Sequence, residues 1–288
     1  MTLGTGVHLG IPAQVYHADP CIVPSLSSSI AQVLLRESPY KAWFSHPRLN
    51  KGYSEDRADK FDLGTAAHAM LLEDNESAMA VVDADDWRTK AAQAQRDAAR
   101  AAGKTPILAG HFQKVLEMVA AAKAFIPTSE IGSAWKAADS EVTAVIQESG
   151  TWLRCRFDRA TKDRRVIMDY KTTEDASPET FSRQIPRMGY HLQDAFYRRI
   201  ARTLNGATVP EPIFAFLVQS VTPPYECSLA GCDPTLQEIA DYEVGRAIQL
   251  WRDCIKADKW PSYGGRIHWT IPTIWQIKQH EERLQEAA

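Results

Sequence analysis

The segment Trp152–Lys171 constrains the fold of this chain more than any other, because its pattern predicts two short strands joined by a polar turn. In the first strand, apolar residues alternate with polar ones that end at Asp158, which is the two-residue period of a half-buried strand. The second strand alternates in the same way and places Asp169 and Lys171 on one face. The sequence therefore predicts a β-hairpin that delivers two carboxylates and one ammonium group to a single place.

The residue types on this hairpin point to hydrolysis that uses a metal ion. Carboxylate oxygens are the ligands that Mg²⁺ prefers, and a lysine beside them can orient a water molecule or offset charge on a phosphate. The alternative is an ordinary solvated salt-bridge face. Asp169, however, follows the apolar residues Ile167 and Met168, and a carboxylate in such a run is costly to desolvate unless it binds a partner. This context favours a functional site.

Two further blocks carry side chains suited to the same site. The stretch Phe61–Glu73 predicts a helix whose small residues allow close packing, with His68 among apolar neighbours. Further along, Gln193 and Tyr197 are four residues apart and share a face of a predicted helix, with Tyr190 on the same stripe. The alternatives are a core histidine that binds nothing and a hydrogen bond on the helix surface. The hairpin carboxylates favour the functional interpretation of both blocks.

The order of the predicted elements is helices first, then strands crossed by a helix. This order predicts an α/β fold, with a mixed central β-sheet flanked by helices and an N-terminal helical region. We expect residues 1–288 to form one domain, with a mainly helical part at 1–130, a sheet core at 131–225 and a C-terminal helix and tail at 226–288. The predicted helices follow the SLSSS segment, surround His68 and cover about Trp87–Ala124, Tyr190–Leu204 and Pro234–Lys256, and the predicted strands cover Trp135–Gln147, Trp152–Ala160, Val166–Thr172 and Ile213–Ser220.

Composition and charge narrow the class of protein. The hydrophobic share of 44% is enough for a large core, and the chain shows neither a signal peptide nor a transmembrane run. We therefore expect a cytoplasmic protein with no membrane partner. The 33 basic and 36 acidic residues give a net charge of −3, so the surface as a whole is not basic. Arginines crowd the hairpin, which is the distribution expected of an enzyme that encloses DNA in a basic channel.

These blocks, taken in order, resemble the PD-(D/E)XK nuclease superfamily. The pattern D-(x)10-D-Y-K followed by GYHLQDAFY is most similar to the RecE-type (exonuclease VIII) and lambda-exonuclease-like members, which are phage or prophage recombination exonucleases. The Gly-x-x-x-His spacing that ends at His68 and the acidic Glu141 before the hairpin fit the same pattern. The resemblance spans most of the chain and implies a restriction-endonuclease-like core.

The resemblance also implies roles for individual residues. It implies one or two Mg²⁺ ions, for which Mn²⁺ could substitute, in a bacterial host cell and with no nucleotide cofactor. In this scheme Asp158, Asp169, His68 and the backbone carbonyl of Tyr170 bind metal, Glu141 binds a second ion or its water, Lys171 positions the attacking water, and Gln193 and Tyr197 hold the phosphate backbone or orient Lys171.

The serine-rich segment near residue 27 carries a separate hypothesis. A helix N-terminus presents free N–H groups and a positive dipole end, so Ser27 and Ser28, with Arg36 and Lys41 nearby, could hold a terminal 5′-phosphate. The alternative is plain N-capping with surface charge. The predicted DNA- or phosphate-binding set is Ser27, Ser28, Arg36, Arg154, Arg156 and Tyr190.

The reaction implied by the resemblance is 5′→3′ digestion of one strand of linear double-stranded DNA, which leaves a 3′ overhang for a single-strand annealing protein. Processive digestion implies a ring-shaped homo-oligomer, with a trimer favoured over a tetramer. The alternatives are a metal-dependent endonuclease, a RecB-like or Cas4-like nuclease, and a non-catalytic DNA-binding protein on a decayed nuclease fold. An iron–sulfur cluster is disfavoured, because the late cysteines lack a Cys-x-x-Cys pair. The tryptophan-rich tail Trp260–Trp275 could pack in the core, in a subunit interface or on DNA.

Overall fold

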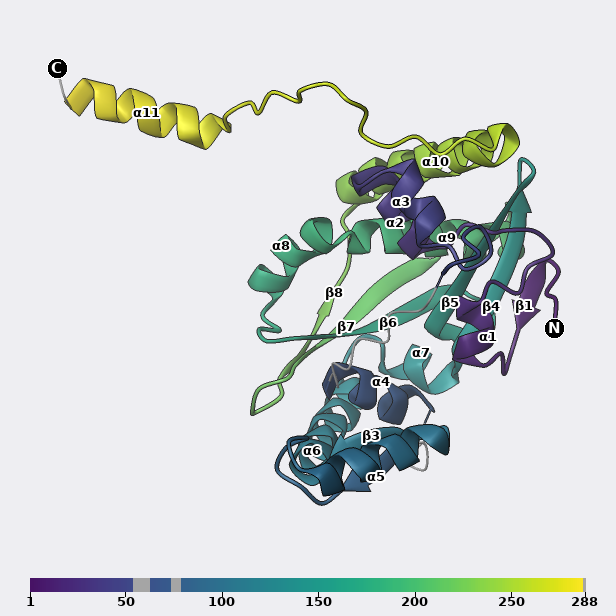
Figure 1. The fold of residues 1–288 in the computed structure, drawn as a ribbon, viewed down its shortest axis with the longest axis vertical. Coiled ribbons are helices and arrows are strands. Elements are labelled where there is room, and N and C mark those ends of the chain that lie inside the picture. The colour runs from purple at the N-terminus through teal and green to yellow at the C-terminus, as the bar shows by residue number, and fades with distance from the viewer. Residues whose placement is uncertain (54–62, 74–78, 287–288) are drawn as a thin grey trace.

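A computed structural model describes residues 1–53, 63–73 and 79–286 of the chain; Phe61 and Asp62 of the predicted His68 helix lie outside these ranges. A six-stranded sheet in the order β1-β4-β5-β6-β7-β8 forms its centre (Figure 1). β6 and β7 are parallel, and the other neighbouring strands are antiparallel. The predicted mixed sheet is therefore confirmed. The strands are β1 (Gly6–His8), β4 (Ala138–Glu148), β5 (Thr151–Thr161), β6 (Val166–Thr173), β7 (Ile213–Ser220) and β8 (Cys227–Ala230).

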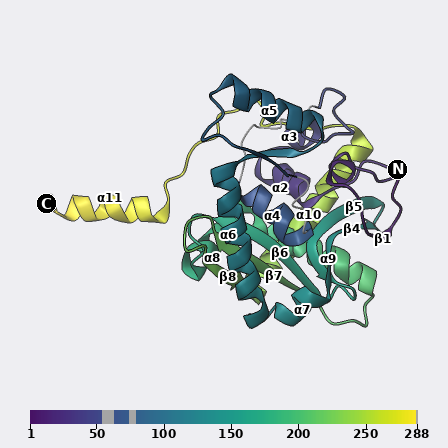
Figure 2. The ribbon, with the colours of Figure 1, turned by 90° about the horizontal axis from the view of Figure 1, so that it is seen from below.

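Helices cover both faces of the sheet, and each face has its own apolar core. In Figure 1 the upper layer contains α2, α3, α9 and α10, and the lower layer contains α4, α5 and α6. Figure 2 shows α6 and α4 lying across the lower side. The helices are α1 (Ala13–His17), α2 (Ser28–Arg36), α3 (Pro39–Phe44), α4 (Leu63–Glu73), α5 (Lys90–Ala101), α6 (Ala109–Phe125), α7 (Gly132–Ala137), α8 (Pro178–Met188), α9 (Tyr190–Asn205), α10 (Pro234–Ala257) and α11 (Ile274–Glu286).

Strand β6 shows why the sequence alternation places the site. Ile167 packs into the upper core, whereas Met168 and Tyr170 pack into the lower one. Because side chains alternate across a strand, Asp169 and Lys171 lie on the same side as Ile167, toward α9. A sheet buried on both faces thus leaves these two polar residues inside the molecule.

Local sequence signals fix the helix that lies opposite these residues. Gly189 joins α8 to α9 with a φ of 77°, in the left-handed region that glycine adopts without steric cost. A Cβ at this position would lie 2.6 Å from the Gln32 side chain, so a larger residue would push the Gln32 amide away. Gln32 in turn donates from Nε2 to the carbonyl of Met188 at 2.7 Å. This turn sets the direction in which α9 starts and therefore where Gln193 points.

Two predicted boundaries are wrong. The strand predicted from Trp135 begins at Ala138, because residues 132–137 form α7. The Trp135 ring instead lies under the Arg159 guanidinium, 4.7 Å from its centroid, and its carbonyl accepts from the same side chain. The helical stretch predicted over Trp87–Ala124 is interrupted by β3 (Thr105–Leu108), which pairs with β2 (Met79–Val82). Both differences come from contacts with distant residues, which local periodicity does not report.

In the described part of the chain, no helix has both the length and the apolar character needed to cross a membrane.

Candidate active site

The site lies where strands β5 and β6 separate. Their regular pairing joins Ala160 to Ile167 and Arg159 to Met168, so Asp158 and Asp169 are the next residues beyond it. The backbone N–H of Tyr170 donates to Asp158 Oδ2 at 2.9 Å instead of joining the ladder. The predicted hairpin therefore opens at the two aspartates, which leaves room for a ligand between them.

Three side chains from three elements converge at one side of this opening. His68 of α4 places Nε2 3.1 Å from Asp158 Oδ2 and Nδ1 3.7 Å from Glu141 Oε1. One ligand atom from each of His68, Glu141 and Asp158 lies within 4.8 Å of the others. Glu141 falls between the paired residues Ser140 and Val142 and has a φ of 55°. This left-handed conformation is uncommon outside glycine, and strain of this kind concentrates at functional sites.

Asp169, Lys171 and Gln193 form the other side of the opening. Asp169 is only 1% exposed. It pairs through Oδ2 with Lys171 Nζ at 2.5 Å, and its Oδ1 accepts from Gln193 Nε2 at 2.6 Å. Lys171 also lies over the ring of Tyr190, 5.0 Å from the centroid. The ammonium group is thus held between a carboxylate and an aromatic face.

Burial and mutual repulsion separate the pKa values of the two aspartates. Burial, followed by the nearby charge of Asp158, raises the pKa of Asp169 to about 6 although Lys171 opposes this. Burial also acts to raise the pKa of Asp158, but the hydrogen bond from His68 and the charges of His68 and Lys171 hold it below its ordinary value. The Asp158 carboxylate is therefore kept ionised, whereas Asp169 takes up a proton more readily.

The remaining ionisable groups respond to the same carboxylates. Burial would lower the pKa values of His68 and Lys171, but the neighbouring carboxylates raise both above their ordinary values. Burial raises the pKa of Glu141, and its ion pair with Arg156 only partly offsets this. The three carboxylates thus dominate the electrostatics of the site, and the same field would attract a cation.

The donor set fits a divalent metal ion. Glu141 Oε1 is shielded from solvent, yet it accepts no hydrogen bond from any residue in the described ranges. A buried oxygen without a donor is costly unless a ligand satisfies it. Two carboxylates and one imidazole are suitable first ligands for Mg²⁺ or a related ion, with water in the remaining positions. His68, Glu141 and Asp158 are therefore the best-placed metal ligands, with Asp169 beside them. The predicted metal set was His68, Asp158, Asp169 and the Tyr170 carbonyl, with Glu141 at a second ion or its water.

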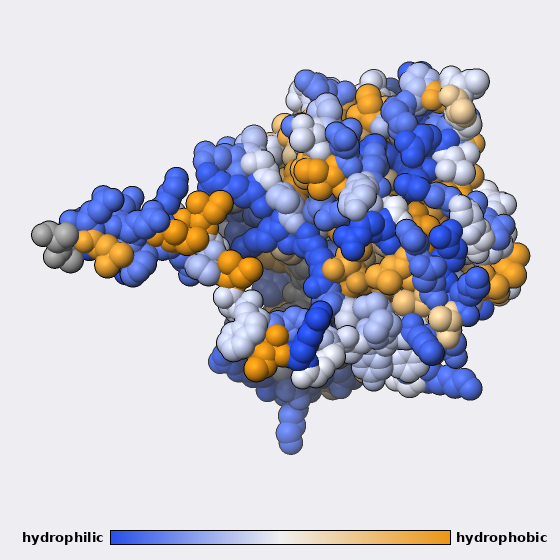
Figure 3. Space-filling view, turned by 90° about the horizontal axis from the view of Figure 1, so that it is seen from above, coloured by the Kyte–Doolittle hydropathy of each residue, from blue (hydrophilic) through white to orange (hydrophobic). Residues whose placement is uncertain are grey.

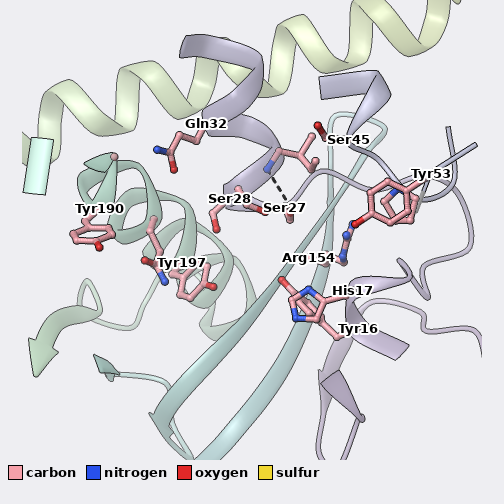
Figure 4. A pocket seen from close by; sticks show the side chains of 15 residues that line it. Tyr16, His17, Ser27, Ser28, Gln32, Ser45, Tyr53, Arg154, Tyr190 and Tyr197 are labelled. Atoms are coloured by element: carbon pink, nitrogen blue, oxygen red, sulfur yellow. Dashed lines mark hydrogen bonds between the residues drawn. The ribbon is translucent and has the colours of Figure 1, made fainter. Parts of the chain in front are cut away.

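A pocket of about 320 Å³ adjoins the carboxylates. Figure 4 shows its side chains converging from the end of α1, from α2, from the segment that follows α3, from β5 and from α9. Ser27 caps α2 by accepting from Ile30 N–H, and Ser28 and Ser29 follow in the first turn. Gln193 lines the pocket and also donates to Asp169, so the pocket and the carboxylate site share a wall. The lining residues include Tyr16, His17, Ser27, Ser28, Ser29, Gln32, Ser45, Tyr53, Arg154, Tyr190, Gln193 and Tyr197.

Arg154 supplies the positive charge of this pocket. It is 3% exposed, and its Nη1 donates to the Ser25 carbonyl at 2.8 Å and to the Ser25 hydroxyl at 2.7 Å. Nη1 also lies 3.2 Å from Asp19. Its Nε is buried without a hydrogen-bond partner among the described residues. An anion in the pocket would therefore meet the N-terminus of α2 beside the guanidinium of Arg154, which already pairs with Asp19.

Other predicted DNA-binding residues lie elsewhere. Arg36 is outside the pocket lining and donates to the carbonyls of Arg187 and Pro186 at the end of α8. Arg156 pairs with Glu141 and donates to the Ile11 carbonyl. Both guanidinium groups are thus engaged within the protein, and neither belongs to the pocket lining.

Tyr197 and several unpredicted residues complete the pocket. The Tyr197 ring is buried edge-on against Phe157 and Phe214, and its side chain lines the pocket. Tyr16 and His17 were missed, because no local pattern connects them to Arg154. Only the tertiary fold places the Tyr16 ring under Arg154 and His17 in the same pocket lining. Ser29 belonged to a visible serine run and could have been included.

Comparisons with known proteins agree with this geometry. The family model described as a PDDEXK-like domain of unknown function (DUF3799) matches residues 36–273. The crystal structure of a protein from Eubacterium rectale, named as a putative exonuclease, is similar with a TM-score of 0.54 at 10% sequence identity. That match covers 96% of this chain and 98% of the other, and it shows a shared fold. No curated protein matches the chain significantly. Because the family model covers most of the sequence, the chain belongs to the family of PDDEXK-like domains.

Proposed function

We propose that this protein is a Mg²⁺-dependent exodeoxyribonuclease that digests one strand of linear double-stranded DNA in the 5′→3′ direction. The observation that carries the proposal is the wall shared by the carboxylate site and the anion-binding pocket. Gln193 contacts Asp169 on one side and lines the pocket on the other. A terminal 5′-phosphate in the pocket would place the first phosphodiester bonds of the strand near the carboxylates.

The residues of the chain divide the work of hydrolysis. His68, Glu141 and Asp158 would hold the metal ion, which would supply Lewis-acid stabilisation of charge on the scissile phosphate. Lys171 is positioned by Asp169 and Tyr190, and it would orient the attacking water and offset negative charge. Gln193 would fix the Asp169 carboxylate and contact the phosphate backbone. Nucleases of the PDDEXK class generally use divalent metals, which agrees with these roles.

The pocket gives the proposed polarity a physical basis. A terminal phosphate carries more negative charge than an internal one, so the start of α2 and Arg154 would favour a 5′-phosphorylated end. Digestion would then leave a 3′ overhang available to a single-strand annealing protein, and a ring of subunits around the DNA would keep the enzyme bound between steps.

The activity is tested with linear duplex DNA labelled separately at its 5′ and 3′ ends, with closed circular DNA as the control. We expect release of 5′-labelled mononucleotides from linear DNA in Mg²⁺, with the circle intact and Lys171→Ala inactive. Cutting of the circle would identify an endonuclease instead. Failure to cleave either substrate in Mg²⁺ or Mn²⁺ would support a non-catalytic DNA-binding protein.

The role of the pocket is tested separately through Ser28→Asp, which adds negative charge to the lining. We expect this variant to lose the preference for 5′-phosphorylated over 5′-hydroxyl ends. Ser182→Asp, on the exposed surface of α8, is the matched control and should keep the preference. Equal wild-type rates on the two kinds of end would reject the phosphate pocket but leave the nuclease assignment standing.

A further inference from the structure

The C-terminal segment from residue 261 to residue 286 leaves the body of the molecule, and we call it the C-terminal arm. Figure 1 shows it running away from α10 and ending in the separate helix α11. Six of its large apolar side chains are mostly in solvent, with exposed fractions that range from 64% to 83%. These side chains are Tyr263, Ile267, Trp269, Ile271, Ile274 and Trp275.

The apolar residues of the arm are arranged in faces. Ile267, Trp269 and Ile271 alternate with polar residues, as on one side of an extended strand. In α11, Ile274 and Ile277 are three residues apart and lie on one face of the helix. Soluble monomers rarely leave contiguous apolar faces of this kind in water. The arm is therefore built to be covered by another surface.

The start of the arm is anchored, which directs it outward. Trp260 packs edge-on against Trp251 of α10, with ring centroids 5.2 Å apart. The carbonyl of Pro261 accepts from Tyr40 N–H of α3 at 3.1 Å. Beyond this anchor the chain forms no helix or strand before α11, and about twelve residues can span at most roughly 40 Å when extended. The arm thus reaches well past its own body.

We propose that the arm docks on a second copy of this chain and links copies into an oligomer. The area supports this occupant. Buried aromatic side chains contribute about 150–250 Å² each, so Tyr263, Trp269 and Trp275 with the isoleucines offer on the order of 800 Å². That is about one partner's share of a standard stable interface, and a second arm in return would complete it.

The body carries exposed apolar side chains on α3 and along α10. Figure 3 looks onto this end of the molecule and shows apolar side chains on the body as well as along the arm. The exposed members are Tyr40 and Phe44 on α3 and Ile239, Tyr242 and Ile255 on α10. We assign this surface, the α3/α10 face, as the receptor for the arm of the neighbouring copy.

The test compares the mass in solution of the full-length protein with that of variants, by sedimentation velocity over a wide range of concentrations. We expect wild type to form a discrete oligomer, and the arm variant Trp269→Ser/Trp275→Ser to self-associate at least about 100-fold more weakly. Ile213→Ser is the matched control, because Ile213 is exposed to a similar degree at the start of β7. The Ile213→Ser control should assemble like wild type. Each variant should also keep the thermal unfolding transition of a folded subunit, which shows that the substitutions leave the fold intact.

A mixing experiment identifies the receptor. The variant Ile239→Ser/Tyr242→Ser carries an intact arm but a damaged α3/α10 face, and it should also fail to assemble alone. Mixed with the arm variant, it should form a heteromer, because one intact arm then meets one intact receptor. A monomeric wild type, or an oligomer that the arm substitutions leave unchanged, would overturn the proposal. Absence of the heteromer would overturn the assignment of the receptor. None of these outcomes depends on nuclease activity.

Discussion

Two buried aspartates in this molecule, Asp19 and Asp169, shift their pKa values in opposite directions. Burial would raise the pKa of Asp19, but hydrogen bonds from His46 and Ser25 and the charge of Arg154 hold it below its ordinary value. Burial and the nearby Asp158 raise the pKa of Asp169 to about 6. Both side chains are almost inaccessible, at 3% and 1% exposure. The difference therefore comes from their partners and not from their depth.

The comparison separates structural from functional burial of charge. Asp19 accepts hydrogen bonds from Ser25 N–H at 2.9 Å and from the Ser25 hydroxyl at 2.7 Å. It also pairs with Arg154, so the protein itself satisfies this carboxylate. At the candidate active site two aspartates and Glu141 crowd together, and Glu141 Oε1 has no donor within the described ranges. A folded chain tolerates such repulsion where a ligand relieves it. We therefore expect Asp19 to support stability and the site carboxylates to support activity.

The largest expected effect is on activity at the site. Asp158→Asn keeps the shape of the side chain and an oxygen for Tyr170 N–H, but it removes the negative charge that would bind metal. We expect kcat for linear duplex DNA to fall about 10³-fold or more, with little change in the free energy of unfolding. Initial rates and urea denaturation of the same preparation would measure both. A large loss of unfolding free energy in Asp158→Asn would show that Asp158, like Asp19, supports the stability of the fold.

The next effect is on stability at Asp19. Asp19→Ala leaves Arg154 buried without its carboxylate, and we expect a loss of about 3–5 kcal/mol in the free energy of unfolding. Chemical denaturation measures it, with the exposed residue Asp85→Ala as the matched control. A loss below that of ordinary surface substitutions would show that the network around Asp19 is not structural.

Metal binding should stabilise only the intact site. At a Mg²⁺ concentration about 100 times the dissociation constant, we expect the free energy of unfolding to rise by about 2.7 kcal/mol. Glu141→Gln should remove most of this gain. Glu148→Gln should keep it, because Glu148 lies on the same strand as Glu141 but pairs with Arg199 of α9. Thermal melting with Mg²⁺ and with EDTA tests the difference. Equal gains in both variants would move the metal away from Glu141.

The smallest effect is the opposite pH dependence of the two aspartates in metal-free protein. The folded pKa of Asp169 is raised, so its contribution is fully present below pH 3.8 and is lost as the pH rises through about 6. Lowering the pH from 7 to 4 should therefore stabilise wild type relative to Asp169→Asn, by on the order of 2 kcal/mol. The folded pKa of Asp19 is lowered, so its contribution is present above pH 3.8 and is lost as the pH falls below it.

Denaturation in EDTA at several pH values, with Asp169→Asn and Asp19→Asn beside wild type, checks both signs. Asp169→Asn should lose stability relative to wild type as the pH falls from 7 to 4, and Asp19→Asn should gain stability relative to wild type as the pH falls below 3.8. If either sign is reversed, the contrast between the aspartates is wrong.

Much of the sheet and of the hairpin that carries Asp158 and Asp169 was predictable from local pattern. The alternation in β5 and β6 identified both strands and the side of β6 on which Asp169 and Lys171 lie. Helices α9 and α10 were also predicted closely, because their apolar stripes follow the helical period. Such patterns survive in the sequence because each element buries one face along its own length.

Contacts between distant segments were not predictable in the same way. β2 and β3 are each four residues long, and they pair although more than twenty residues separate them in the sequence. Helix α7 replaces the expected start of β4. Arg154 and Arg156 look alike in the sequence, yet one lines the anion pocket and the other pairs with Glu141. Periodicity gives the face of a strand but not the partner that meets it.

The sequence by itself determined the secondary structure around the site and the identities of its carboxylates, lysine and histidine, because these depend on spacing within single elements. The tertiary structure alone decided which carboxylate oxygen has no donor, which arginine faces the pocket and that the tryptophans of the C-terminal arm lie in solvent. These properties depend on burial and on partners from distant segments, and the pKa of a carboxylate follows from both.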